Sequence, residues 1–214
     1  MDLLDKYKKA WENQSEDEQK VSKVDIYRMT KLRSSSIVKW IFIIGLMEFL
    51  LWSVLNIMIS KTKYLDIYED LNMLTLLNYT YYFNLVVIIV FLYLFYKNYT
   101  SINTTDNTKS LMSKIIKTRK TVKYYMYYNI IGGVLLMIIF NLIIINTPNG
   151  IEIIMPNEAA KFSDKSELIS VFLISQAIVI LLMIGILVVF YYLLYGILLR
   201  KLNKNYKDLA KLDE

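Results

Sequence analysis

The stretch IVKWIFIIGLMEFLLWSVLNIMI, residues 37–59, decides the fold of this chain. It contains one lysine near its start and one acid, and its other residues are mostly apolar. A helix needs about 20 such residues to cross the hydrocarbon layer of a membrane. Unpaired backbone amides and carbonyls are very costly in lipid, so a stretch of this kind forms a helix there. It therefore predicts a membrane-spanning helix.

Three further apolar stretches follow, at residues 79–96, 124–145 and 168–199. Together the four stretches predict an all-α polytopic membrane protein with four transmembrane helices and helical extensions. The remaining segments are expected to be an N-terminal cytoplasmic segment with short amphipathic helices (1–36), an outer loop (60–78), a basic cytoplasmic loop and helix (97–123), a second outer loop (146–167) and a cytoplasmic helical tail (200–214).

Lysine and arginine predict the orientation of the chain. Nine of them occur up to Lys39, two in 60–78, seven in 97–123, two in 146–167 and five from Arg200 onward. Basic segments stay cytoplasmic, so both termini and the middle loop are predicted inside, an N-in/C-in topology. The first 36 residues are polar and carry no cleavable signal pattern, so the first span is expected to be a retained anchor.

Tyrosine is abundant near the predicted inner membrane interface. An amphipathic aromatic ring is stable at the level of the lipid headgroups, so these residues are expected to form an interfacial belt. The ten tyrosines are Tyr93, Tyr96, Tyr99, Tyr124, Tyr125, Tyr127, Tyr128, Tyr191, Tyr192 and Tyr195.

The fourth apolar stretch is longer than a membrane crossing requires, and its end continues as a helical pattern. Apolar residues there recur at spacings of 4, 3, 4 and 3, which is typical of helix pairing. The expected partner is the helix within 97–123, lying antiparallel to it, and a second copy of the chain is the alternative. We call these residues the C-terminal seam: Tyr195, Leu199, Leu202, Tyr206 and Leu209.

Leu3, Leu4, Tyr7 and Trp11 recur at helical spacing near the N-terminus, with lysines between them. Such an amphipathic helix either lies on the inner leaflet or docks in a groove of a cytoplasmic protein. The alternative is a frayed terminus with incidental periodicity. These four residues are the candidate partner-binding residues.

Glu48 is the one acid predicted inside the membrane, and it lies near the middle of the first span. An ionised carboxylate is costly there, so the residue is expected to be protonated, hydrogen-bonded or facing water within the bundle. Gly45, Trp52 and Asn56 share its helix face. Amide side chains on the other three helices are the expected partners: Asn84, Asn129, Asn141 and Gln176.

Two interpretations of Glu48 remain open at this point. The functional one is a proton, cation or ligand site formed with Asn56, Asn84, Asn129 and Gln176. The structural one is a neutral side chain that joins helices by hydrogen bonds, which contribute about 0.6 kcal/mol each on average within membranes.

The residue types that the chain lacks bear on its chemistry. It has no histidine and no cysteine, which removes a Ser-His dyad, a thiol nucleophile and most zinc, haem and iron-sulfur ligand sets. No glycine-rich phosphate loop occurs. We therefore expect no enzyme activity, no cofactor and no metal site. The net charge of +6 fits anionic lipid at the inner leaflet, and nucleic acid is not an expected partner.

DIYRM at residues 25–29, followed by SSSIVKW at residues 34–40, resembles a group of uncharacterised four-span inner-membrane proteins of Gram-negative bacteria. Some members of that group are encoded beside sigma-70-type sigma factors. The resemblance is clearest over about the first 60 residues. It implies a bacterial inner-membrane location and a membrane-tethered regulator whose cytoplasmic segment engages a transcription factor.

The sequence therefore favours a non-enzymatic integral membrane regulator or adaptor. Its expected partners are the lipid bilayer and either a cytoplasmic protein, such as a sigma factor, or further copies of the chain. One alternative is a small transporter or channel subunit built around Glu48. Another is a structural subunit of a larger membrane complex.

Overall fold

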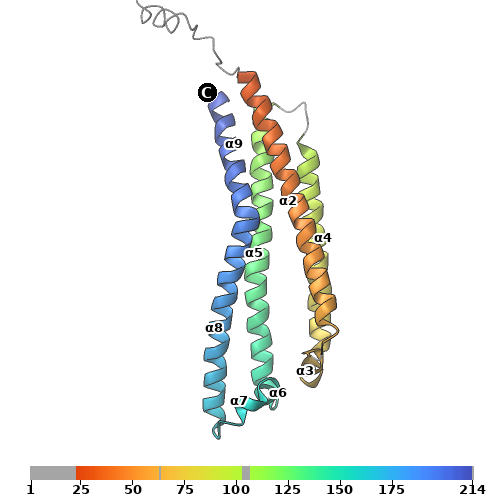
Figure 1. Ribbon diagram of the computed structural model, residues 1–214, viewed down its shortest axis with the longest axis vertical. Helices are drawn as coiled ribbons and strands as arrows, with labels where there is room; N and C mark the ends of the chain where they lie inside the picture. The colour runs from red at the N-terminus through yellow and green to blue at the C-terminus, as the bar shows by residue number, and fades with distance from the viewer. Residues whose placement is uncertain (1–22, 63, 103–106, 214) are drawn as a thin grey trace, which may run out of the picture.

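The computed structural model describes residues 23–62, 64–102 and 107–213, and within these ranges the regular structure is entirely helical. The predicted all-α fold is confirmed. The elements are α2 (Lys23–Ile59), α3 (Tyr64–Asp70), α4 (Leu74–Ser101), α5 (Thr108–Asn146), α6 (Gly150–Ile154), α7 (Pro156–Ala159), α8 (Lys165–Tyr191), the π-helical segment η1 (Tyr192–Gly196) and α9 (Ile197–Asp213) (Figure 1).

Four helical rods are long and apolar enough to cross a membrane: α2, α4, α5 and the continuous run from α8 through α9. Their outer surfaces are apolar. On α8, for example, Ile174, Leu181 and Ile186 are 64%, 69% and 68% exposed. Contiguous apolar surface of this kind marks contact with a membrane or a partner, and here it surrounds helices of spanning length. The protein is embedded in a membrane.

Three rods continue beyond their apolar stretches at the same end of the molecule (Figure 1). We call this part the basic bundle: residues 23–36 of α2, residues 108–123 of α5, and α9. In it Leu202 and Leu209 of the C-terminal seam are fully buried in one core with Leu111 and Ile115 of α5. The predicted antiparallel pairing of these two helices is confirmed. The structure adds α2, which packs against α9 as well.

Buried polar contacts fix the register of the basic bundle. Asn205 Nδ2 on α9 donates to Ser34 Oγ on α2 at 3.0 Å, and Ser34 Oγ donates to the carbonyl of Thr30 at 2.8 Å. A part-buried contact links the bundle to α4, since Lys114 Nζ on α5 donates to the carbonyl of Ser101. Because buried polar groups are costly when unpaired, these contacts favour one alignment of the helices.

A second core closes the opposite end, where the short helices α3, α6 and α7 lie. Leu71 and Met73, next to α3, pack there with Ile151 of α6 and Phe172 of α8. The turn into α6 requires glycine at position 150, because a Cβ there would lie 2.2 Å from the carbonyl oxygen of Ile144. The positions at which the bilayer begins and ends along each helix stay predictions.

Candidate functional site

Glu48 lies on α2 in the middle of the four-helix arrangement and is only 3% exposed. The hydroxyl of Tyr191 donates a hydrogen bond to its Oε1 at 2.8 Å. The hydroxyl of Tyr195 donates to its Oε2 at 2.9 Å. Each oxygen of the carboxyl group therefore has a buried donor, which lowers the cost of placing this polar group among apolar helices.

The two tyrosines are carried by an irregular part of the fourth rod. Tyr191 is the last residue of α8, and Tyr195 lies within η1. Positions four residues apart lie on the same helix face, so both hydroxyls reach one side chain. Short π-helical segments inside α-helices occur frequently at functional sites, and this one faces the buried acid.

Aromatic rings from two other helices enclose these groups. Phe95 of α4 and Tyr125 of α5 meet edge to face with ring centres 5.4 Å apart, and Tyr125 lies 5.9 Å from the ring of Tyr195. Tyr125 also meets the ring of Tyr191 edge to face, with ring centres 6.1 Å apart. We call Glu48, Tyr125, Tyr191 and Tyr195 the Glu48 cluster. Edge-to-face packing of this kind stabilises aromatic pairs beyond the area they bury.

A close approach of α2 to α4 brings the acid to the aromatic rings. A Cβ added to Gly45, one turn before Glu48, would lie 3.1 Å from the ring of Phe95. The missing side chain therefore lets Phe95 pack against the backbone of α2. Gly45 lies on the same helix face as Glu48, as the sequence predicted.

Two sequence-based expectations about this region are wrong. Tyr125, Tyr191 and Tyr195 were expected in the interfacial belt, but they are at most 2% exposed and lie in the core, which for Tyr195 agrees with its place in the C-terminal seam. Amides were expected to hold Glu48, yet Asn129 Nδ2 donates to the carbonyl of Tyr125, four residues earlier on its own helix, at 2.9 Å. A short amide side chain reaches this nearby carbonyl easily, whereas a tyrosine hydroxyl extends across to a neighbouring helix.

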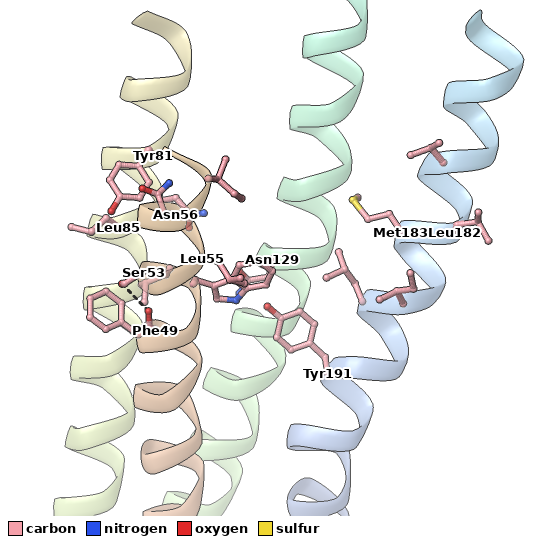
Figure 2. A pocket seen from close by; sticks show the side chains of 17 residues that line it. Phe49, Ser53, Leu55, Asn56, Tyr81, Leu85, Asn129, Leu182, Met183 and Tyr191 are labelled. Carbon is pink, nitrogen blue, oxygen red and sulfur yellow. Dashed lines mark hydrogen bonds between the residues drawn. The ribbon is translucent and has the colours of Figure 1, made fainter. Parts of the chain in front are cut away.

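A cavity of about 720 Å³ adjoins the Glu48 cluster, between α2, α4, α5 and α8 (Figure 2). Three of the predicted site residues line it together: Asn56, Asn84 and Asn129. Tyr191 lines it too and connects it to Glu48 through its hydroxyl. Most of the other lining side chains are apolar, including Leu55, Ile59, Leu85, Ile88, Val179, Leu182, Met183, Ile186 and Leu187.

The remaining candidates lie elsewhere. Gln176 is half-buried on α8 and is not among the residues that line this cavity. Leu3, Leu4, Tyr7 and Trp11 fall outside the described residues. The functional residues that sequence reasoning missed are Tyr191 and Tyr195, and the available signal was their four-residue spacing opposite a buried acid.

The residues of the site favour a structural role over metal binding. Among the residues that the structure describes, no three acidic, histidine or cysteine side chains gather as a metal site would require. The Glu48 cluster instead joins α2 to α5 and to the fourth rod through polar and aromatic contacts. It can therefore hold these helices in one alignment beside a cavity that has room for a small molecule.

A family model described as "Domain of unknown function (DUF8845)" matches residues 24–214. The chain belongs to this family. The DUF8845 match covers the basic bundle, the Glu48 cluster, the cavity and both cores. Comparison with curated proteins and with solved structures finds no significant match.

Proposed function

We propose that this protein is a non-enzymatic regulator or adaptor of the bacterial inner membrane that engages a cytoplasmic protein. A sigma-70-type sigma factor is the candidate partner, by the sequence resemblance described above. In this proposal the basic bundle faces the cytoplasm and presents the binding surface. The membrane-spanning part anchors that surface and holds it in one conformation.

The observation that carries the proposal is the continuity of three helical rods from the apolar region into the basic bundle. Helix α2 has 37 residues, which corresponds to about 55 Å at 1.5 Å per residue, well beyond the roughly 30 Å hydrocarbon layer. The excess is packed around a buried core rather than left as isolated helix ends. A rigid helical platform fused to membrane spans is suited to positioning a partner at the membrane surface.

The basic bundle also exposes apolar side chains. Met29 and Leu32 on α2 are 46% and 65% exposed, although they precede the first apolar stretch. Such residues commonly mark contact surfaces for other proteins. Lys31 and Arg33 lie beside them in sequence, so an acidic partner surface with an apolar centre is the expected complement.

The transporter alternative draws less support from Glu48. Both of its carboxyl oxygens accept hydrogen bonds from buried tyrosines, so a transported cation would have to displace these donors. The structural-subunit alternative predicts a membrane partner instead of a cytoplasmic one. The identity of copurifying proteins therefore separates it from the regulator.

The test is copurification of the full-length protein from its native membranes in mild detergent, followed by mass spectrometry. We expect a cytoplasmic protein in near-stoichiometric amount. A variant carrying both Met29→Glu and Leu32→Glu should lose it, because two charges enter the apolar centre of the contact. Lys207→Glu, at an exposed position on α9 of the same bundle, is the matched control and should retain it.

Three results contradict the proposal. One is recovery of membrane proteins alone, which favours a structural subunit. Another is a cytoplasmic partner that binds the double variant and the wild type equally, which places the contact elsewhere. The third is the absence of any stoichiometric partner at several protein concentrations.

A further inference from the structure

We infer that the edge at which α5 and α9 meet binds the phosphate of an anionic phospholipid, such as a phosphatidylglycerol, through Arg119, Lys123 and Arg200. The headgroup would lie where the membrane-spanning part joins the basic bundle, and the acyl chains would follow the apolar surface next to it. This edge is separate from the α2 surface assigned to the cytoplasmic partner, and the inference does not require that partner.

The three cations lie at nearly the same height along two antiparallel helices. The rings of Tyr125 and Tyr195 are 5.9 Å apart, which aligns α5 with the fourth rod at that point. Arg119 precedes Tyr125 by six residues and Arg200 follows Tyr195 by five, so each lies about 7–9 Å further toward the basic bundle. Lys123 precedes Tyr125 by two residues. All three cations are therefore within about 6 Å of one another along the helix axes.

Arg119 and Lys123 lie on the side of α5 away from α4, where the helix meets α9. Helix α5 packs between α4 and α9 (Figure 1). Its edge toward α4 is marked by Thr121, whose hydroxyl accepts a hydrogen bond from Asn98 of α4 at 3.1 Å. Residues two apart point to different sides of a helix, so Arg119 and Lys123 lie away from the edge of Thr121. The two cations are four residues apart and share one face.

Arg200 belongs to the corresponding side of α9. Asn205 marks the edge toward α2, because it donates a hydrogen bond to Ser34 of that helix. Asn203, two residues earlier, lies on the opposite edge, which is the one toward α5. Arg200 precedes Asn203 by three residues and is its neighbour on the helix surface. The exposed guanidinium of Arg200 therefore borders the same edge as Arg119 and Lys123.

Arg119 has no anionic partner in the part of the chain that the structure describes. It is half-buried, and its Nε is enclosed without a hydrogen bond, so the neighbouring helices hold the side chain in place. Its two terminal nitrogens are not enclosed in this way. Helix α5 contains no acid, and Asp208, the nearest acid on α9, is eight residues or about 12 Å beyond Arg200. A phosphate would supply the pairing that partly buried arginines usually have.

The surroundings of these cations favour a lipid over a soluble anion. The guanidinium carbon of Arg200 lies over the ring of Tyr192, 5.0 Å from its centre, where the apolar surface of the fourth rod begins. Apolar and aromatic side chains next to the cations are open: Ile197 is 43% exposed and Tyr124 is 63% exposed. Cations that border an apolar surface at the end of a membrane span match a headgroup with its acyl chains.

The cations also determine which charge the headgroup should carry. Phosphatidylglycerol has a net negative charge, whereas phosphatidylcholine balances its phosphate with a quaternary ammonium group. That ammonium group would meet three cations and no carboxylate of α5. Each basic side chain near a membrane surface favours anionic lipid, so the three together predict a clear preference for phosphatidylglycerol.

The inference is tested by native mass spectrometry of the full-length protein in detergent. Palmitoyl-oleoyl-phosphatidylglycerol and the phosphatidylcholine with the same acyl chains are titrated separately, and the apparent Kd of the first bound lipid is measured. We expect phosphatidylglycerol to bind about tenfold more tightly. An excess of glycerol 3-phosphate, which has the phosphate but no acyl chains, should not displace it.

Arg119→Gln combined with Arg200→Gln removes two of the three cations and should make the two lipids bind nearly equally. Arg28→Gln combined with Arg33→Gln is the matched control: it removes the same charge from exposed positions on α2 of the same bundle and should keep the preference. Lys123→Gln, at an exposed position, should weaken the preference in part. It tests the site even if the first double variant does not fold.

Three outcomes overturn the inference. Equal binding of the two lipids by the wild type would mean that no anionic site exists. Equal loss of the preference in both double variants would mean that it comes from the overall charge of the basic bundle. Displacement by glycerol 3-phosphate would mean that the edge binds soluble phosphates. Each of these leaves the copurification test of the proposed function unaffected, because that test substitutes Met29 and Leu32.

Discussion

Two tyrosine hydroxyls determine how single residues of the site respond to substitution. They donate to both oxygens of Glu48. A side chain that replaces Glu48 is therefore tolerated only if it still offers hydrogen-bond partners to these two hydroxyls. A glutamine retains one acceptor oxygen, and its amide group can donate to a hydroxyl oxygen. A leucine offers neither, and both hydroxyls would then lie unpaired in the core.

We therefore expect Glu48→Gln to unfold in detergent at nearly the temperature of the wild type, and Glu48→Leu to lose about 1–3 kcal/mol of stability. Thermal denaturation followed by circular dichroism measures both. Met47→Leu, at the exposed neighbouring position, is the control and should change little. Equal losses in the glutamine and leucine variants would show that the hydrogen bonds do not stabilise the cluster.

The same glutamine variant distinguishes the regulator from the transporter. In liposomes we expect no proton or cation flux that depends on Glu48. A flux that is clear for the wild type and absent for well-folded Glu48→Gln protein would favour the transporter.

Residue-level prediction from sequence succeeded for Glu48 and failed for its partners. An acid at the centre of an apolar span must be paired or hydrated, so its importance followed from position alone. Which side chains pair with it depends on how the helices are rotated and spaced. Tyr191 fits an interfacial belt equally well by position, and only the packing of the helices shows that it lies in the core; Tyr195 was assigned to the C-terminal seam, but its bond to Glu48 did not follow from that spacing.

At the level of elements, helix pairing at the basic bundle depends on the C-terminal seam. Leu202 and Leu209 are fully buried there, between α9 and its neighbours. The seam was predictable because its spacing defines a single apolar face of the helix. The contribution of α2 was not, because spacing indicates which face is buried but not how many helices cover it.

Leu202→Asp should destabilise the protein by several kcal/mol, since it places an unpaired charge in this core. Unfolding in detergent, monitored by circular dichroism, provides the measurement. Lys204→Asp puts the same side chain at an exposed position of α9, two residues away, and should have a much smaller effect. If the two variants are equally stable, the seam is solvent-exposed in the folded protein and the described pairing is wrong.

At the level of the whole molecule there are two separate cores. One extends from the basic bundle to Tyr125, Tyr191 and Tyr195 of the Glu48 cluster, the other lies at the opposite end of the helices, and the cavity adjoins the Glu48 cluster. The four apolar stretches were enough to predict the number of long helices. The cavity could not be predicted, because its shape depends on the distances between helices and not on any one residue pattern. Asn56, Asn84 and Asn129 line this cavity together, in keeping with the tendency of polar side chains in spans to face the bundle interior, and their role as a site stays a prediction.

The proposed regulator requires that the basic bundle faces the cytoplasm, because a bundle on the outside could not reach a cytoplasmic partner. Reporter proteins fused after chosen residues test it most directly, with alkaline phosphatase active only outside and a fluorescent protein folding only inside. We expect fusions after Glu69 and Glu158 to report outside, and fusions after Lys109 and Glu214 to report inside. A fusion after Lys109 or Glu214 that reports outside would contradict it.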